Sequence, residues 1–298
     1  MRDGGAAGFF AGPMQRALAR CSLIFAGVAV FSGAINLLAL TGSLYMLQVY
    51  DRVLPSLSVP TLIGLSLLMV GLYLTTGFLD FVRLRVMSRV GVRIDDELRD
   101  RVFAAVQLLP LRSRHGSDGL QPVRDLDQIR SYLSGLGPTA LFDLPWIPVY
   151  LAVIFVLHLL LGVFSVAGGL VLVALTLVTD MRSKGPLMAA ALSASRRLAL
   201  GEAARRNAEV IQAMGLGPRL ARRWSEVNAI HIDAQLEASD AVGGISAVSK
   251  VFRLLLQSGM LGLGAYLVII GSLSAGSIIA ASIIMSRALA PIETSIAH

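Results

Sequence analysis

Long apolar runs constrain the fold of this chain more than any other feature of its sequence. Six of them carry few charged residues and lie at about residues 22–50, 58–79, 143–160, 163–179, 251–270 and 277–296. About 20 predominantly apolar residues in a helix span the ~30 Å hydrocarbon core of a bilayer. Only 15% of the residues are charged, whereas soluble domains carry about 25%. The sequence therefore predicts an all-α membrane protein with a bundle of six transmembrane helices.

The second run continues as a helix beyond the expected membrane. Charges occur from Asp80 to Leu109, yet apolar residues still recur every four positions, at Val82, Val86, Val90, Ile94, Leu98, Val102 and Val106. This is a helical period, and Pro110 is expected to end the helix. A second charged stretch follows Asp180. The pattern predicts two long helical hairpins outside the membrane, at about 80–140 and 180–249.

Each hairpin is interrupted by a short segment flanked by Gly and Pro. The first contains VRDLDQIR at 123–130, and the second contains GLGP at 215–218. Such residues mark turns, so each hairpin has a blunt tip. A soluble motor can grip a blunt tip, but the tip can also simply close a loop, and the residues alone leave both interpretations open.

The arginines predict the orientation. Basic residues flank both hairpins, whereas the three short turns between paired runs hold only Arg52. The positive-inside rule then places both hairpins and both termini in the cytoplasm. Residues 1–20 have Phe9 and Phe10 opposite Arg16 and Arg20. We expect an amphipathic helix there on the inner membrane surface, with a disordered tail as the alternative.

Several function classes fit the sequence poorly. The net charge is +7, and we attribute it to basic residues on the cytoplasmic side of a membrane protein. We expect no nucleic-acid partner, because the arginines are not interleaved with aromatic residues. The single cysteine, Cys21, and four scattered histidines suggest no disulfide or metal site. No Asp or Glu lies within the core of an expected span, which disfavours an ion-coupled secondary transporter.

Five strings carry a family resemblance. They are LYMLQVYDRVLPSLSVPTL (44–62), QPVRDLDQIRSYLSG (121–135), FDLPWIPVYLAVIFVLH (142–158), EAARRNAEVIQAMGL (202–216) and SRALAPIE (286–293). They resemble, in order and over most of residues 21–293, the permease–ATPase of bacterial type I secretion systems. The branch is the one that exports proteases, lipases and haemophores, and its membrane part is an ABC exporter transmembrane domain.

The resemblance implies a function and partners. Two copies would form a homodimer in the bacterial inner membrane, around a pathway for an unfolded polypeptide. A membrane-fusion protein and an outer-membrane channel would continue the route. The segments around 118–130 and 215–224 would be coupling helices that dock on nucleotide-binding domains, which would hold ATP and Mg²⁺. The coupling candidates are Arg124, Asp125, Asp127, Arg130, Arg219 and Arg222; without the resemblance, an ordinary solvated face explains the charges of the first segment equally well.

The sequence departs from the family pattern at its end. The family continues into an ATPase domain, whereas the sequence given ends at His298. It holds no G-x-x-x-x-G-K-[ST] loop, because its only lysines, Lys184 and Lys250, lack that context. We expect no catalytic or cofactor-binding residue and no ATP hydrolysis by this chain alone. It is then a separated membrane domain, a truncated gene product or a permease subunit. A non-transporting scaffold or inhibitory partner of a full-length copy is the alternative function.

Polar residues within the apolar runs are the remaining candidates. Asn36, Gln48 and Arg287 are candidates to line the pathway, because polar groups in membrane helices usually face the bundle interior. Asn36 can instead hydrogen-bond a neighbouring helix, and Arg287 can extend toward the inner surface. Asp143 and Trp146 are expected to anchor the start of the third span, by helix capping and interfacial placement.

Overall fold

The computed structural model describes residues 22–112, 121–135 and 137–297. Every regular element among them is a helix, which confirms the all-α prediction. The expected amphipathic segment 1–20 lies outside the described residues. The elements are α2 (Ser22–Leu38), α3 (Thr41–Gln48), the π-helix η1 (Val49–Val53), α4 (Leu54–Ser56), α5 (Val59–Arg112), α6 (Gln121–Ser134), α7 (Gly137–Asp143), the 3-10 helix η2 (Leu144–Trp146), α8 (Ile147–Leu157), α9 (Leu159–Arg206), α10 (Ala208–Ala213), α11 (Gly217–Ile269) and α12 (Ala275–Ala297).

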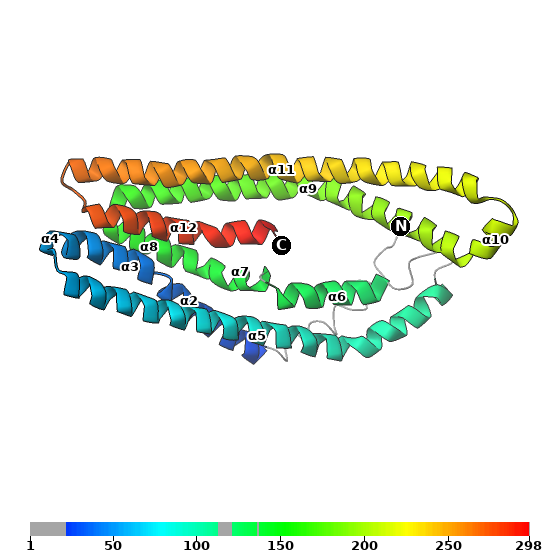
Figure 1. Ribbon diagram of the computed structural model, residues 1–298, viewed down its shortest axis with the longest axis horizontal. Helices are drawn as coiled ribbons and strands as arrows, with labels where there is room; N and C mark the ends of the chain where they lie inside the picture. The colour runs from blue at the N-terminus through cyan, green and yellow to red at the C-terminus, as the bar shows by residue number, and fades with distance from the viewer. Residues whose placement is uncertain (1–21, 113–120, 136, 298) are drawn as a thin grey trace. The chain divides into compact units, whose positions relative to one another are not determined.

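The chain divides into two compact units. Of the described residues, unit 1 takes in 22–102, 125–135, 137–171 and 253–297, and unit 2 takes in 103–112, 121–124 and 172–252. The long helices α5, α9 and α11 each contribute residues to both units. In unit 1, α12 packs against α3, α7 and α8, as Figure 1 shows.

Among the residues that the structure describes, five helical stretches are apolar and long enough to cross a membrane, judged by length and composition. They are Ser22–Ser56, Val59–Leu108, Gly137–Leu157, Leu159–Arg206 and Gly217–Ile269, and a shorter apolar helix covers Ala275–Pro291. At 1.5 Å per residue, the 54 residues of α5 are about 80 Å long. This is far more than a ~30 Å hydrocarbon core requires.

The chain reverses between α4 and α5 later than the sequence predicts. The gap between the apolar runs 22–50 and 58–79 predicts a short turn that contains Asp51, Arg52 and Pro55, but η1 and α4 continue the helical path as far as Ser56. Leu57 then adopts a left-handed φ of 52°. Pro55 has no N–H to donate to the preceding turn of this continuous helical path.

The hairpin of α8 and α9 turns earlier than predicted. The gap between the apolar runs 143–160 and 163–179 predicts a turn at Gly162, but the backbone is extended at His158, with φ −165° and ψ 136°, and α9 starts at the next residue. Gly162 lies inside the first turns of α9, where an added Cβ would collide with the ring of Phe155. The glycine therefore permits close packing and does not make the turn.

The buried face of α5 in unit 1 follows the predicted ridge only in part. Val90, Ile94, Leu98 and Val102 form a core cluster with Leu126 of α6. Nearer the start of α5, the buried positions are Arg83 and Met87 in place of Val82 and Val86. Steps of four residues drift around a helix with 3.6 residues per turn, so one shorter step keeps the same face buried.

In unit 2, α9 and α11 are joined by side-chain hydrogen bonds and by a short tip. Ser193 Oγ lies 3.1 Å from His231 Nδ1, and Arg197 donates to Asn228 Oδ1 over 3.2 Å. The separate short helix of this tip is α10, followed by Gly215 with a left-handed φ of 63°. Residues 217–224, expected in a short coupling helix, instead form the first turns of the long α11.

Candidate functional site

A network of buried polar side chains joins α2, α5 and α7 within unit 1. Arg83 of α5 donates to Asp80 Oδ1 over 2.7 Å and to Asp143 Oδ1 over 3.2 Å. Asn36 of α2 donates to the same oxygen of Asp143 over 2.7 Å. Arg83 is 6% exposed and Asn36 7%. A charge as buried as that of Arg83 needs a partner, and its guanidinium pairs with the two carboxylates of Asp80 and Asp143.

Asn36 lies at the centre of this network. Its amide nitrogen also donates to the Ser32 carbonyl over 2.8 Å, and its Oδ1 accepts the Tyr150 hydroxyl over 2.8 Å. Arg83 donates to Ser32 Oγ over 3.0 Å. Asn36 therefore links α2 to α7 and α8, as expected of a polar residue that binds neighbouring membrane helices.

The network borders a cavity of about 300 Å³. Asn36, Asp80, Arg83, Asp143 and Tyr150 line it together with Arg287 of α12. Thus Asn36 and Arg287, both selected from the sequence, meet at one cavity. Arg287 is exposed, and no ion pair joins it to another of the described residues. A charge at the centre of a membrane helix costs at least about 2.5 kcal/mol, so an unpaired Arg287 calls for a functional explanation.

Gln48 lies elsewhere in unit 1. It borders a separate cavity of about 180 Å³, with Thr41 and Tyr45 of α3 and Leu65, Leu68 and Leu72 of α5. Gln48 is exposed and does not line the cavity that holds Arg287. The three candidates for the pathway therefore do not form one cluster.

Asp143 and Trp146 lie at the start of the third expected span, where helix capping and interfacial placement were predicted, but their side chains contact other helices. The Asp143 side chain makes no capping hydrogen bond, and it binds Arg83 and Asn36 instead. Trp146 packs on α2, where a Cβ added to Gly33 would lie 3.0 Å from its ring. Both residues therefore attach the start of α8 to other helices.

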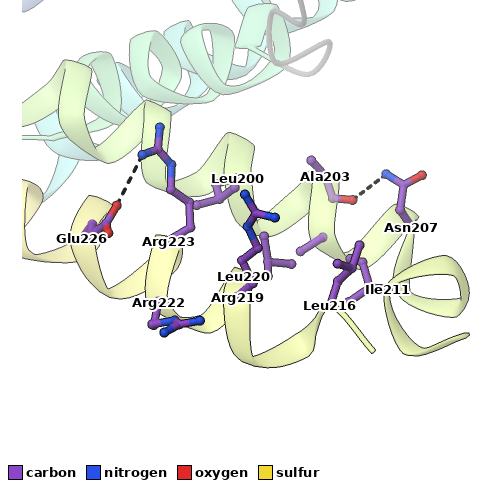
Figure 2. A pocket seen from close by; sticks show the side chains of 11 residues that line it. Leu200, Ala203, Asn207, Ile211, Leu216, Arg219, Leu220, Arg222, Arg223 and Glu226 are labelled. Atoms are coloured by element: carbon purple, nitrogen blue, oxygen red, sulfur yellow. Dashed lines mark hydrogen bonds and ion pairs between the residues drawn. The ribbon is translucent and has the colours of Figure 1, made fainter. Parts of the chain in front are cut away.

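A larger groove of about 970 Å³ lies at the tip of unit 2. It is formed by the end of α9, by α10 and by the start of α11, as Figure 2 shows. Leu200, Ala203, Ile211, Leu216 and Leu220 give it an apolar lining. Arg219, Arg222, Arg223, Glu226 and Asn207 provide its polar groups. Arg219 and Arg222, expected from the sequence to couple to a partner, therefore line the same groove.

The groove carries an excess of positive charge. Arg223 pairs with Glu226 over 3.3 Å, whereas Arg219 and Arg222 have no ion-pair partner among the described residues. Figure 2 shows the Arg222 side chain pointing away from those of Arg219 and Arg223. All three follow Gly217, the first residue of α11. Arg219 lies in the first turn, where a cation opposes the helix dipole, so its position suits an acidic partner better than it suits the isolated helix.

A neighbouring pair on α9 is already neutralised. Arg205 donates to both carboxylate oxygens of Glu202, over 2.7 and 3.0 Å. These hydrogen bonds hold the pKa of Glu202 below its ordinary value. Arg205 is therefore engaged, whereas Arg219 and Arg222 are available.

The other coupling candidates lie on α6. Arg130 pairs with Asp127 over 2.8 Å and with Asp95 of α5 over 3.4 Å, which ties α6 to α5. Arg124 and Asp125 lie on the same helix, and residues 118–120 of the expected segment are outside the described residues.

Within the part of the chain that the structure describes, no group of three or more His, Cys, Asp or Glu residues could hold a metal ion.

Sequence reasoning missed the roles of Arg83, Asp80 and Tyr150. The signal available was the i, i+3 spacing of Asp80 and Arg83 at the end of an apolar run. That spacing permits an ion pair on one helix face. It does not show that the face is buried, and Tyr150 gave no signal at all.

Comparison with known proteins identifies the family. Residues 19–290 match the model of the ABC transporter transmembrane region. The chain is 46% identical over 282 residues to the type I secretion system ATP-binding protein PrsD of Rhizobium meliloti, covering 95% of this chain and 48% of that protein. It is 28% identical to the alpha-hemolysin translocation ATP-binding protein HlyB of Escherichia coli and 26% identical to the exotoxin translocation ATP-binding protein PaxB of Pasteurella aerogenes, covering 90% of this chain and 38% of each relative.

The chain thus spans about half the length, or less, of these curated relatives. The match to the family extends over nearly all of its described helices. The apolar helices of both units agree with the match, since several are long enough to cross a bilayer. The chain belongs to the ABC transporter transmembrane region family and is a multi-pass, all-α membrane protein of the ABC exporter type.

Proposed function

We propose that this chain is the membrane-spanning part of an ATP-driven type I protein secretion exporter. The observation that carries the proposal is the 46% identity, over 95% of the chain, to a type I secretion system ATP-binding protein. Two copies form the pathway for an unfolded polypeptide in the inner membrane, with both termini cytoplasmic. A membrane-fusion protein and an outer-membrane channel receive the polypeptide.

ATP hydrolysis belongs to an associated nucleotide-binding domain. The sequence of this chain has no glycine-rich loop followed by lysine to cradle phosphates, so ATP and Mg²⁺ bind outside it. The role of this chain is to receive the movement that the nucleotide-binding domain makes when it hydrolyses ATP. In this proposal the domain docks on the basic groove lined by Arg219 and Arg222, and on α6 around Arg124, Asp125, Asp127 and Arg130.

The groove fits such a partner in shape and charge. An apolar lining with two unpaired guanidinium groups suits an acidic, partly apolar surface. Continuous helices α9 and α11 begin or end at the groove, and a helix transmits displacement along its length better than a loop. A scaffold without transport, the alternative function, gains no support from these features.

A charge reversal in the groove tests the proposal. In the exporter that contains this chain, Arg219→Glu with Arg222→Glu places like charges against the docking domain. Secretion of the exported polypeptide should fall by at least about tenfold, with unchanged amounts of exporter in the membrane. The matched control, Arg182→Glu with Arg196→Glu, reverses two exposed charges of α9 outside the groove and should secrete normally.

Two results contradict the proposal. If the exporter secretes no polypeptide even without substitutions, the proposed function is wrong. If the groove variant secretes as well as the control, docking at the groove is wrong, while a secretion role through α6 remains testable by Arg130→Glu.

A further inference from the structure

The cavity beside Asn36 contains a guanidinium group that the protein leaves unpaired. Both carboxylates of the cavity are engaged by Arg83, which lies 2.7 Å from Asp80 and 3.2 Å from Asp143. Asn36 gives Asp143 a further hydrogen bond. Arg287 also lines the cavity but has no ion-pair or hydrogen-bond partner among the described residues. One cationic group therefore remains available there.

The helix α12 holds Arg287 at this place. It begins at Ala275, so Arg287 lies about 18 Å along it at 1.5 Å per residue. Met285, Ala288 and Leu289 are 1%, 1% and 5% exposed. These packed neighbours on either side fix the rotation of the helix. Arg287 therefore cannot turn to another surface without unpacking the core of unit 1.

We propose that Arg287, at the cavity that it shares with Asn36 and the Arg83–Asp143 ion pair, binds carboxylate side chains of the polypeptide in transit. This inference rests on the proposed function and adds a preference for acidic segments. A cavity of about 300 Å³ is at the small end of ligand pockets. It accommodates one or two side chains of an extended chain and not a folded domain.

The surroundings of Arg287 keep this binding weak. Asp80 is half-exposed beside the same cavity, so its charge opposes a bound carboxylate. Conduction along a pathway requires sites that bind strongly enough to admit the cargo and weakly enough to release it. An arginine with acidic neighbours meets both requirements.

A binding measurement with two peptides tests the proposal. The full chain is placed in phosphatidylcholine nanodiscs, and fluorescence anisotropy is recorded with a labelled glutamate-rich peptide and with its glutamine counterpart. The glutamate peptide should bind about fivefold tighter, as expected for one exposed ion pair. Arg287→Gln should abolish that preference, and Arg287→Lys should restore part of it. Arg52→Gln, which removes an exposed arginine outside the cavity, should leave the preference unchanged.

Each other outcome overturns the inference. Equal binding of both peptides by the unmodified chain excludes a carboxylate site. Loss of both peptides in Arg287→Gln, without rescue by Arg287→Lys, indicates a structural role. If anionic phosphatidylglycerol in the nanodisc removes the preference, Arg287 binds a lipid phosphate instead. The assay needs neither ATP nor secretion, so its failure leaves the proposed function to be judged separately by the secretion test.

Discussion

Arg83 has the most buried charged side chain of the network in unit 1, with 7% of the side chain exposed, compared with 22% for Asp143 and 43% for Asp80. Replacing it by methionine removes the cation and leaves the less exposed carboxylate with only Asn36 as a partner. Removing one member of a buried ion pair is strongly destabilising. We expect Arg83→Met to lower the free energy of unfolding by about 3–5 kcal/mol, measured by thermal unfolding in detergent.

Two further variants separate this effect from a general loss of charge. Arg99→Met removes an arginine whose side chain is 66% exposed, and it should cost less than about 1 kcal/mol. Arg83→Met combined with Asp143→Asn should cost less than the sum of the single changes, because no uncompensated carboxylate remains at Asp143. Equal losses in Arg83→Met and Arg99→Met would contradict the role given to Arg83.

At the residue scale, a polar group that interrupts an apolar run is the feature that a sequence can single out. Asn36 and Arg287 could be selected because such groups are costly in lipid unless they face the bundle interior. Arg83 could not be interpreted in this way, because arginines also collect at the cytoplasmic membrane boundary. Its burial depends on a shift of one residue in the ridge, from Val82 to Arg83. No local pattern of residues fixes that shift.

At the scale of elements, the start of α12 is fastened to the end of the first helical run. Asp51 of η1 accepts hydrogen bonds from Ser274 Oγ over 2.5 Å and from the Gly276 N–H over 2.9 Å. A Cβ added to Gly276 would lie 2.7 Å from Asp51 Oδ1 and 2.8 Å from the Leu47 carbonyl oxygen. The close approach therefore requires glycine.

Gly276→Ala should loosen this attachment. The backbone must move to accept the methyl group, and overpacking of this kind costs about 1–3 kcal/mol. Gly262→Ala is the matched control, because nothing lies within 4 Å of its added Cβ and alanine favours a helix by about 0.5–1 kcal/mol. The unfolding midpoint in detergent should fall for the first variant and not for the second. A similar midpoint for both would show that α12 is held by other contacts.

Helix type was easier to predict than helix ends. Apolar runs and four-residue periods indicate helices directly, and the all-α class follows from them. The ends depend on contacts that sequence neighbours do not reveal. Gly162 was assigned to a turn because glycine is frequent in turns, yet it serves packing against Phe155. Similarly, the family resemblance implies a coupling helix at about 215–224, whereas the short helix is α10 and Gly217 begins the long α11.

At the scale of the whole molecule, the distribution of arginines predicts which ends of the helices face the cytoplasm. The chain has one cysteine, Cys21, so a Cys21→Ser background allows single cysteines to be placed at will. Ser272→Cys marks the short turn between α11 and α12, and Met214→Cys marks the tip after α10, where Met214 is 66% exposed. In intact spheroplasts, a membrane-impermeant maleimide should label position 272 and not position 214. Opening the membrane should expose position 214 to the reagent, and the Cys21→Ser background should stay unlabelled throughout. Labelling of position 214 in intact spheroplasts would reverse the proposed orientation and move the basic groove out of reach of a cytoplasmic ATPase.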